Sequence, residues 1–240
     1  MREIVVAGHL GFSFHDDFQT FKKIVDACDN WAFCQIQYNF MDTDYQAGTR
    51  GLQYAASKGL AIIVMEPLRG GRLTRRVPAE VNNLWESAPQ IRTPAEWGLL
   101  WVWNHPEVSM ALSGMTKIEH VVENVSIAER SGSNILSNRE LELIEQVRKA
   151  YQQLYPISCT NCGYCMPCLH EIDIPRIFEI YNDAVAYDDT VSARIYYSML
   201  KPGKRADQCQ ECGECAEVCP QQISIPEWLK KAHALLSPEK

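Results

Sequence analysis

Two runs of four cysteines constrain this chain more than any other feature of its sequence. They are Cys159, Cys162, Cys165 and Cys168, and Cys209, Cys212, Cys215 and Cys219. The second run has the C-x2-C-x2-C-x3-C-P spacing of a bacterial-type [4Fe–4S] ligand set. The first run is one residue shorter before its last cysteine, and Leu169 stands in place of the proline. No regular helix or strand gathers so many thiols from adjacent positions, so each run must fold as a loop around a ligand.

The spacing also predicts how the two runs share their ligands. Three cysteines with two-residue gaps wrap one cubane, and in two-cluster proteins the fourth cysteine ligates the other cluster. We therefore expect crossed ligation, with Cys159, Cys162, Cys165 and Cys219 on one cluster and Cys209, Cys212, Cys215 and Cys168 on the other. Gly163 and Gly213 lie inside the loops, where the backbone must approach a cluster closely.

Zinc, disulfides and free thiols are the alternative interpretations. Disulfides are disfavoured because the sequence shows no secretory signal and the eight cysteines form two matched tetrads. Two zinc sites remain an alternative, because C-x2-C pairs are suited to binding zinc. Zinc sites usually use two separated pairs, however, and the third closely spaced thiol and the Cys219-Pro220 pair favour a cubane.

Composition excludes several classes of function. The chain has 240 residues and a net charge of −7, with no basic block, so we expect no nucleic-acid partner. No apolar run approaches the roughly 20 residues that span a bilayer, so we expect no membrane segment. Cys28 and Cys34 lie outside the runs, and Cys34 is expected to be a buried free thiol. These features together suggest a reducing cytoplasm.

The first half of the chain alternates between strand and helix patterns. Apolar strands are expected over 3–14, 33–40, 60–65 and 108–113, and helices over 17–28, 45–58, 77–87, 94–105 and 118–129. Asp16 is the expected cap of the first helix. Alternating strands and helices predict a parallel α/β sheet, and the spacing is consistent with a TIM barrel, of which four strands are half.

Several motifs in this half resemble the aldo/keto reductase family, strands five to eight of its barrel. Gly11-Phe-Ser13-Phe14 resembles the loop after strand five, and Gln35 resembles the strand-six glutamine. Met65-Glu-Pro-Leu68-Arg-Gly70-Gly71 resembles the loop after strand seven. Ser113-Gly114-Met115-Thr116, followed by Glu119, His120, Glu123 and Asn124, resembles the strand-eight segment. The whole chain resembles the ferredoxin-type subgroup, which carries a C-terminal two-cluster domain.

The resemblance implies binding of NADP(H). The implied contacts are Ser13, Gln35, Met65, Leu68, Gly70, Gly71, Gly114, Met115, Thr116, His120, Glu123 and Asn124. In the family the glutamine forms a hydrogen bond with the nicotinamide carboxamide, and the strand-eight segment binds the adenosine end of NADP(H). This chain departs from the pattern at three places. Phe14 replaces an asparagine, Met65 replaces an aromatic that stacks on the nicotinamide, and His120 replaces an arginine or glutamine.

The family's catalytic Asp, Tyr, Lys and His come from the first half of the barrel, so the resemblance assigns no catalytic residue here. Tyr38, Tyr45 and Tyr54 are expected to be packing or helix residues. A half barrel leaves unpaired strand edges and an uncovered apolar face. We therefore expect a missing N-terminal half barrel, from the same gene or from a partner chain, or an oligomer.

The second half of the chain is expected to be helical. Helices are predicted over 138–154, 174–181, 191–200 and 225–236, which places helices between the two cysteine runs and favours an all-α ferredoxin-like domain. Domains are expected over 1–137 and 138–240. Ile172-Asp-Ile-Pro175 and Ile223-Ser-Ile-Pro226 follow the two runs and form an internal repeat.

Two functions from different classes fit these observations. The first is an iron–sulfur oxidoreductase that moves electrons between a nicotinamide-type carrier and an unknown acceptor, such as a redox partner protein, through two [4Fe–4S] clusters. The alternative is a non-catalytic electron-transfer or docking subunit with a degenerate half barrel. Binding of NADPH with bleaching of the cluster absorbance would distinguish them.

Overall fold

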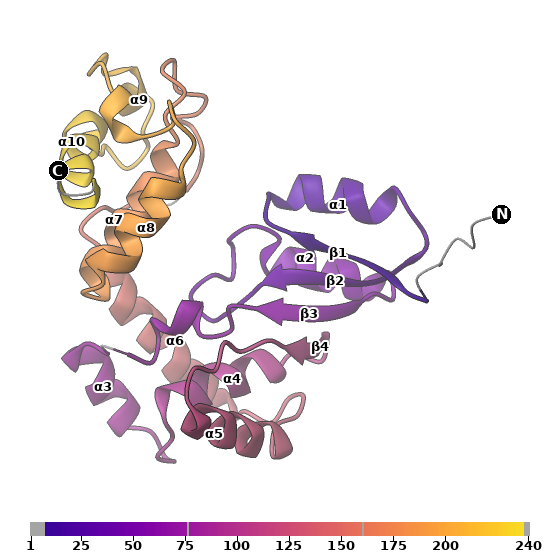
Figure 1. The fold of residues 1–240 in the computed structure, drawn as a ribbon. Helices are drawn as coiled ribbons and strands as arrows, with labels where there is room; N and C mark the ends of the chain where they lie inside the picture. Colours follow the sequence, from indigo (N-terminus) through magenta and orange to yellow (C-terminus); the bar gives the residue numbers. More distant parts are fainter. Residues whose placement is uncertain (1–7, 76, 160, 238–240) are drawn as a thin grey trace. The chain divides into compact units, whose positions relative to one another are not determined.

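The structure is a computed structural model that describes residues 8–75, 77–159 and 161–237 (Figure 1). The chain divides into two compact units, Met1–Arg148 and Lys149–Lys240. Helix α6 (Asn138–Gln153) crosses this division. The domain boundary after residue 137, which places the whole of this helix in the second domain, stays a prediction. No helix in the described ranges is long and apolar enough to cross a bilayer.

The first unit is built on a four-stranded parallel sheet in the order β1-β2-β3-β4 (Figure 1). The strands are β1 (Leu10–Phe14), β2 (Trp31–Gln37), β3 (Ala61–Met65) and β4 (Val108–Ala111). The segments between and after them carry α1 (Phe18–Asp26), α2 (Gly48–Ser57), the 3-10 turn η1 (Arg69–Gly71), α3 (Ala79–Glu86), α4 (Pro94–Trp103) and α5 (Ile118–Glu129). The predicted α/β alternation with parallel strands is confirmed.

The two faces of the sheet differ in burial. On one face five side chains are at most 4% exposed: Phe14, Cys34, Ile36, Ile62 and Val64. Phe14 meets Phe21 of α1 with ring centroids 5.0 Å apart, so the first helix covers this face. We call the opposite face the open face, because its side chains are partly or largely exposed: Ser13, Gln35, Ile63, Met65 and Met110. Parallel strands are normally buried on both faces, so the open face is unusual.

Local sequence determines where the helices begin. Asp17 caps α1, because its carboxylate accepts the N–H of Thr20 at 2.8 Å. The prediction of Asp16 as the cap is wrong by one residue, since Asp16 bonds only the adjacent N–H of Asp17 and cannot reach the third helical residue. Thr93 caps α4 in the same way, and Pro94 occupies its first turn.

A buried polar cluster joins the loops that follow β2 and β3. Asn39 donates to Asp42 at 2.9 Å and to the carbonyl of Glu66 at 3.1 Å. Asp42 forms an ion pair with Arg69 at 3.1 Å, and both side chains are 6% exposed. Because these bonds and the ion pair are buried and link the two loops, the cluster fixes the loops relative to each other.

The second unit is helical, as predicted. It contains α7 (Ile174–Ala186), α8 (Thr190–Met199), the 3-10 turn η2 (Ala206–Gln208), the short α9 (Glu214–Glu217) and α10 (Ile225–Leu236). Ile177 and Phe178 of α7 and Leu229 of α10 belong to one buried core, against which cysteines of both runs pack. The core therefore ties the two cysteine runs to a common helical scaffold.

The two cysteine runs follow matching backbone paths. Three pairs of residues at corresponding places have a positive φ: Asn161 (55°) and Glu211 (54°), Gly163 (78°) and Gly213 (84°), and Glu171 (59°) and Gln222 (52°). Four of these six are not glycine, and such residues rarely adopt this conformation. The internal repeat seen in the sequence therefore extends to the backbone. The second run forms α9 around its third cysteine, Cys215, whereas the described residues of the first run form no helix there, and only Met166 and Pro167 separate its last two cysteines.

Candidate functional site

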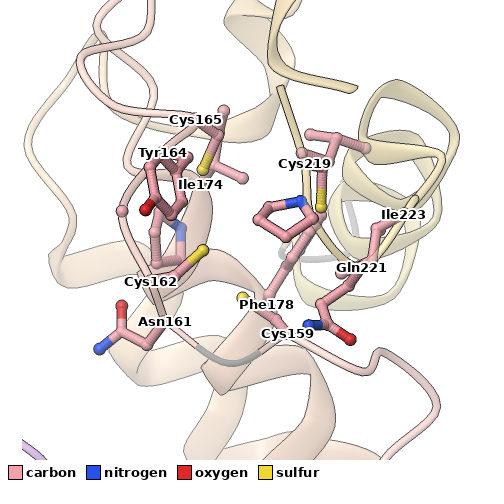
Figure 2. A pocket seen from close by; sticks show the side chains of 14 residues that line it. Cys159, Asn161, Cys162, Tyr164, Cys165, Ile174, Phe178, Cys219, Gln221 and Ile223 are labelled. Atoms are coloured by element: carbon pink, nitrogen blue, oxygen red, sulfur yellow. The ribbon is translucent and has the colours of Figure 1, made fainter. Parts of the chain in front are cut away.

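A cavity in the helical unit is lined by thiols from both runs. Cys159, Cys162 and Cys165 come from the first run, and Cys219 comes from the end of the second. Figure 2 shows their sulfur atoms directed towards a common space. The remaining walls are mainly apolar and include Ile174, Phe178, Pro220, Ile223 and Ile225. The fold therefore brings together cysteines that are up to 60 residues apart in the sequence.

Burial and mutual repulsion raise the pKa of thiols in this cavity. Burial raises the pKa of Cys159, and the nearby Cys162 and Cys219 raise it further, while a backbone hydrogen bond from Asn161 opposes them. Burial raises the pKa of Cys165 to about 11, with smaller contributions from neighbouring thiols that include Cys159. Thiols in such surroundings are protonated at neutral pH, and they become thiolates when a metal supplies the compensating charge.

The remaining four cysteines also lie near one another. Burial raises the pKa of Cys215, and the charges of Cys168, Cys212 and Cys209 raise it further. Cys168 belongs to the first run and the other three belong to the second. Its sulfur also accepts the N–H of His170 at 3.4 Å. The structure thus groups the last cysteine of each run with the first three cysteines of the other.

The thiols around this cavity match the ligand demand of a multi-atom cluster. Four sulfurs placed around a cavity with apolar walls are what a cubane requires, since each of its irons takes one thiolate.

The predicted nicotinamide contacts on the sheet are close together. Ser13 of β1 lies directly opposite Gln35 of β2 in the register of the sheet. Gln35 donates from Nε2 to the sulfur of Met65 at 3.7 Å. All three residues lie on the open face, near the carboxyl ends of their strands. In barrel enzymes this end of the strands carries the active site.

The other predicted contacts are divided between exposed and internally bonded positions. Gly114, Met115, Thr116 and His120 are exposed, as is Gly70, and Gly71 is partly buried. Asn124 donates to the Ser113 hydroxyl at 3.0 Å, and Glu123 accepts from the Thr93 hydroxyl at 2.6 Å. Leu68 packs against Gly98 of α4, where a Cβ atom would lie only 2.6 Å from its Cδ2. Leu68 therefore contacts α4, and the assignment of these residues to a nicotinamide site stays a prediction.

Tyr38 is a packing residue, as expected. It is 1% exposed, and its hydroxyl contacts Thr49 at 2.9 Å and His105 Nε2 at 3.3 Å. Burial raises its pKa to about 12. Cys34 is the expected buried free thiol, and burial raises its pKa to about 12 as well. Sequence reasoning missed the cluster of Asn39, Asp42 and Arg69, although two polar residues within five positions of the end of β2 were an available signal.

Two family models match the chain, one for each unit. The model of the aldo/keto reductase family matches residues 6–149, and the model of a 4Fe-4S dicluster domain matches residues 158–223. The chain belongs to the aldo/keto reductase family. Its second matched region contains all eight cysteines of the two runs, which implies two [4Fe–4S] clusters.

Solved structures give a partial match. The holo form of an aldo-keto reductase from Bacillus halodurans is 21% identical, with a TM-score of 0.46, over 58% of this chain and 49% of that protein. Its apo form gives the same identity and TM-score over 58% of this chain and 50% of that protein. The chain thus spans about half the length of these two structures. A comparison with curated proteins gives no match.

Proposed function

We propose that this chain is an iron–sulfur oxidoreductase that transfers electrons between a nicotinamide-type carrier and an acceptor through two [4Fe–4S] clusters. The observation that carries the proposal is the position of Cys219, which lines the same cavity as Cys159, Cys162 and Cys165. Each cluster, when bound, exchanges one electron at a time, so two clusters match the two electrons of one hydride, whose proton passes to solvent.

The ligand sets in this proposal are crossed. Cys159, Cys162, Cys165 and Cys219 hold one cluster, and Cys209, Cys212, Cys215 and Cys168 hold the other. The grouping of Cys168 with the second run supports this assignment. The N–H groups of Asn161 and His170 that bond cysteine sulfurs would offset part of the negative charge of the thiolates. Hydrogen bonds of this kind tune the reduction potential of a cluster.

The open face of the sheet is the proposed site of the nicotinamide. Gln35, with Ser13 opposite it, would bond the carboxamide, and Met65 would pack on the ring. The four strands correspond in this proposal to strands five to eight of the barrel. The remaining strands would come from the same gene product, from a partner chain or from an oligomer, and would cover the open face. The preference for NADP(H) rests on the family resemblance.

A second candidate function is a non-catalytic electron-transfer or docking subunit. The hydrogen bonds of Glu123 with Thr93 and of Asn124 with Ser113 favour it, because both groups are already satisfied within the protein. The packing of Leu68 against Gly98 of α4 points the same way. In this candidate the sheet is a scaffold, and the clusters exchange electrons with proteins alone.

Anaerobic titration with NADPH separates the two candidates. We expect the purified protein to contain about eight irons and eight acid-labile sulfides per chain, the content of two cubanes. Addition of NADPH should then bleach the visible absorbance of the clusters. Bleaching by dithionite together with no binding of NADPH would support the docking subunit. Absence of sulfide, with zinc in its place, would contradict both candidates.

A further inference from the structure

Each cysteine run is preceded by a short segment whose backbone is bonded to a buried side chain of a helix. Before the first run, the N–H of Ile157 donates to Asn182 Oδ1 at 3.0 Å, and Asn182 Nδ2 donates to the carbonyl of Ile157 at 2.8 Å. Asn182 lies on α7 and is 4% exposed. Its amide thus satisfies both backbone groups of a residue that lies two positions before Cys159.

The second run has an equivalent attachment made with different groups. The N–H of Ala206 donates to the Tyr197 hydroxyl at 3.0 Å, and this hydroxyl also bonds His233 Nδ1 at 2.9 Å. Tyr197 is 1% exposed. Ala206 lies three positions before Cys209, and His233 and Cys209 line the same pocket. The bonds therefore hold the backbone that leads into the second run against α8 and α10.

Asn182 and His233 occupy the same place in the internal repeat. Asn182 lies eight residues after Ile174, at the start of α7, and His233 lies eight residues after Ile225, at the start of α10. Helix α7 bonds the segment before the first run directly, through Asn182, whereas α10 reaches the segment before the second run through Tyr197 of α8. The repeat motif Ile-x-Ile-Pro does not include these positions, so the sequence pattern did not reveal them.

We propose that Asn182 positions the first cluster and that the Tyr197–His233 pair positions the second. This inference rests on the proposed iron–sulfur function. A fixed backbone limits the movement of the first cysteine of each run, so its thiolate stays aligned with its iron. A run that has lost its attachment would release iron more readily, while the other run, with its own attachment intact, would keep its cluster.

Selective variants test this division. Cys162→Ser and Cys212→Ser first assign the electron paramagnetic resonance signals of the two reduced clusters. Asn182→Asp keeps the acceptor for Ile157 N–H but replaces the donor to its carbonyl with a repelling oxygen. We expect it to shift the first signal and to speed iron release from that cluster to a chelator about tenfold, because a buried acceptor is left unsatisfied. Tyr197→Phe should shift the second signal and speed release from that cluster roughly threefold to tenfold.

Tyr151→Phe is the matched control. Tyr151 is also 1% exposed, and its hydroxyl is among the buried side-chain atoms that have no hydrogen-bond partner in the described part of the chain. Its loss should change neither signal. Asn182→Gln and His233→Phe provide second variants if the first ones fail to fold, as judged by circular dichroism. Each should perturb the same cluster as its counterpart.

The outcomes separate this inference from the function on which it rests. A wild-type protein without iron and sulfide would contradict the proposed function. A wild-type protein with two clusters, in which Asn182→Asp and Tyr197→Phe disturb both clusters equally or neither, would overturn the positioning roles alone. A signal change confined to the cluster of the attached run supports them.

Discussion

The two units of this chain differ in how completely they assemble their sites. In the helical unit, thiols from distant positions surround one cavity with apolar walls (Figure 2). In the sheet unit, Ser13, Gln35 and Met65 lie close together but on a face that is open. A cluster needs four thiolates and a local shell, which two loops and two helices can supply. A dinucleotide needs walls along its whole length, and half a barrel supplies only part of them.

The two units also differ in how far each one buries its own apolar side chains. The buried core of the helical unit includes residues next to both runs, such as Ile157, Ile172 and Ile223. The sheet instead ends in two edge strands, β1 and β4, among those described. Met110 on β4 and Ile118 on α5 are 51% and 71% exposed. Apolar surface next to an open strand edge is typical of a face that meets another segment or chain.

The crossed ligand set gives the largest predicted effect. Cys219→Ser should remove the cluster bound by the first run, so that about half of the iron and sulfide is lost. The signal assigned to Cys162 should disappear, and the signal assigned to Cys212 should remain. Iron analysis and electron paramagnetic resonance measure both. Cys28→Ala, a change at a half-buried thiol outside the runs, is the control and should retain all the iron. Loss of the Cys212 signal instead would show that ligation is not crossed.

The buried ion pair of the sheet unit gives the next largest effect. Asp42→Ala should lower the free energy of unfolding of this unit by about 3–5 kcal/mol, because the buried ion pair between Asp42 and Arg69 would be broken. Tryptophan fluorescence during urea unfolding measures the loss, and the iron content should not change. Asp44→Ala is the control, since Asp44 is 85% exposed and its contact with Arg148 is 3.5 Å long. That change should cost less than about 0.5 kcal/mol. Equal losses for the two variants would contradict the role of the buried pair.

Much of this architecture could be predicted from the sequence. Helices α5 and α10 agree with the predicted ranges 118–129 and 225–236 at both ends. For α10 a clear signal marks the start, since Pro226 lies in its first turn. The four parallel strands followed from their apolar runs. Residues 10–14 of the predicted strand 3–14 form β1, and residues 3–7 of that range lie outside the described residues.

The remaining features depend on tertiary contacts that no local pattern carries. In the sequence nothing distinguishes Asn182 from other polar residues on helices. Only the fold shows that its amide bonds the backbone of Ile157. Leu68 matches a family motif, yet it packs against Gly98, which is distant in the sequence. The short helix α9 follows a glycine with a φ of 84° and has no apolar periodicity to predict it. Sequence spacing therefore predicted which cysteines lie together, whereas the side chains bonded to the segments before the two runs could be found only from the fold.

A change at Gln35 tests whether the open face binds a nicotinamide at all. Gln35→Ala should weaken NADPH binding about tenfold, because the carboxamide would lose one buried hydrogen bond. The clusters should still be reduced by dithionite at the wild-type rate. Fluorescence titration of NADPH measures the affinity. Gln19→Ala, on the exposed side of α1, is the control and should have no effect. An unchanged affinity of Gln35→Ala for NADPH would mean that Gln35 does not contact the nicotinamide, and would favour the docking subunit.

The cap of α1 gives the smallest predicted effect, and it tests whether Asp17 rather than Asp16 is the capping residue. Asp17→Ala should lower the free energy of unfolding by about 0.5–1 kcal/mol at pH 7, and Asp16→Ala should cost less, because only Asp17 accepts the N–H of Thr20. That backbone hydrogen bond lowers the pKa of Asp17 below 3.8 in the folded chain. Since the folded pKa is the lower one, the stabilisation is complete above 3.8 and is lost as the pH falls through the folded value. Urea unfolding at pH 7 and pH 3, with both variants compared with the wild type at each pH, should therefore show a difference for Asp17→Ala that shrinks in acid. A constant difference would indicate that the carboxylate charge plays no part in the cap.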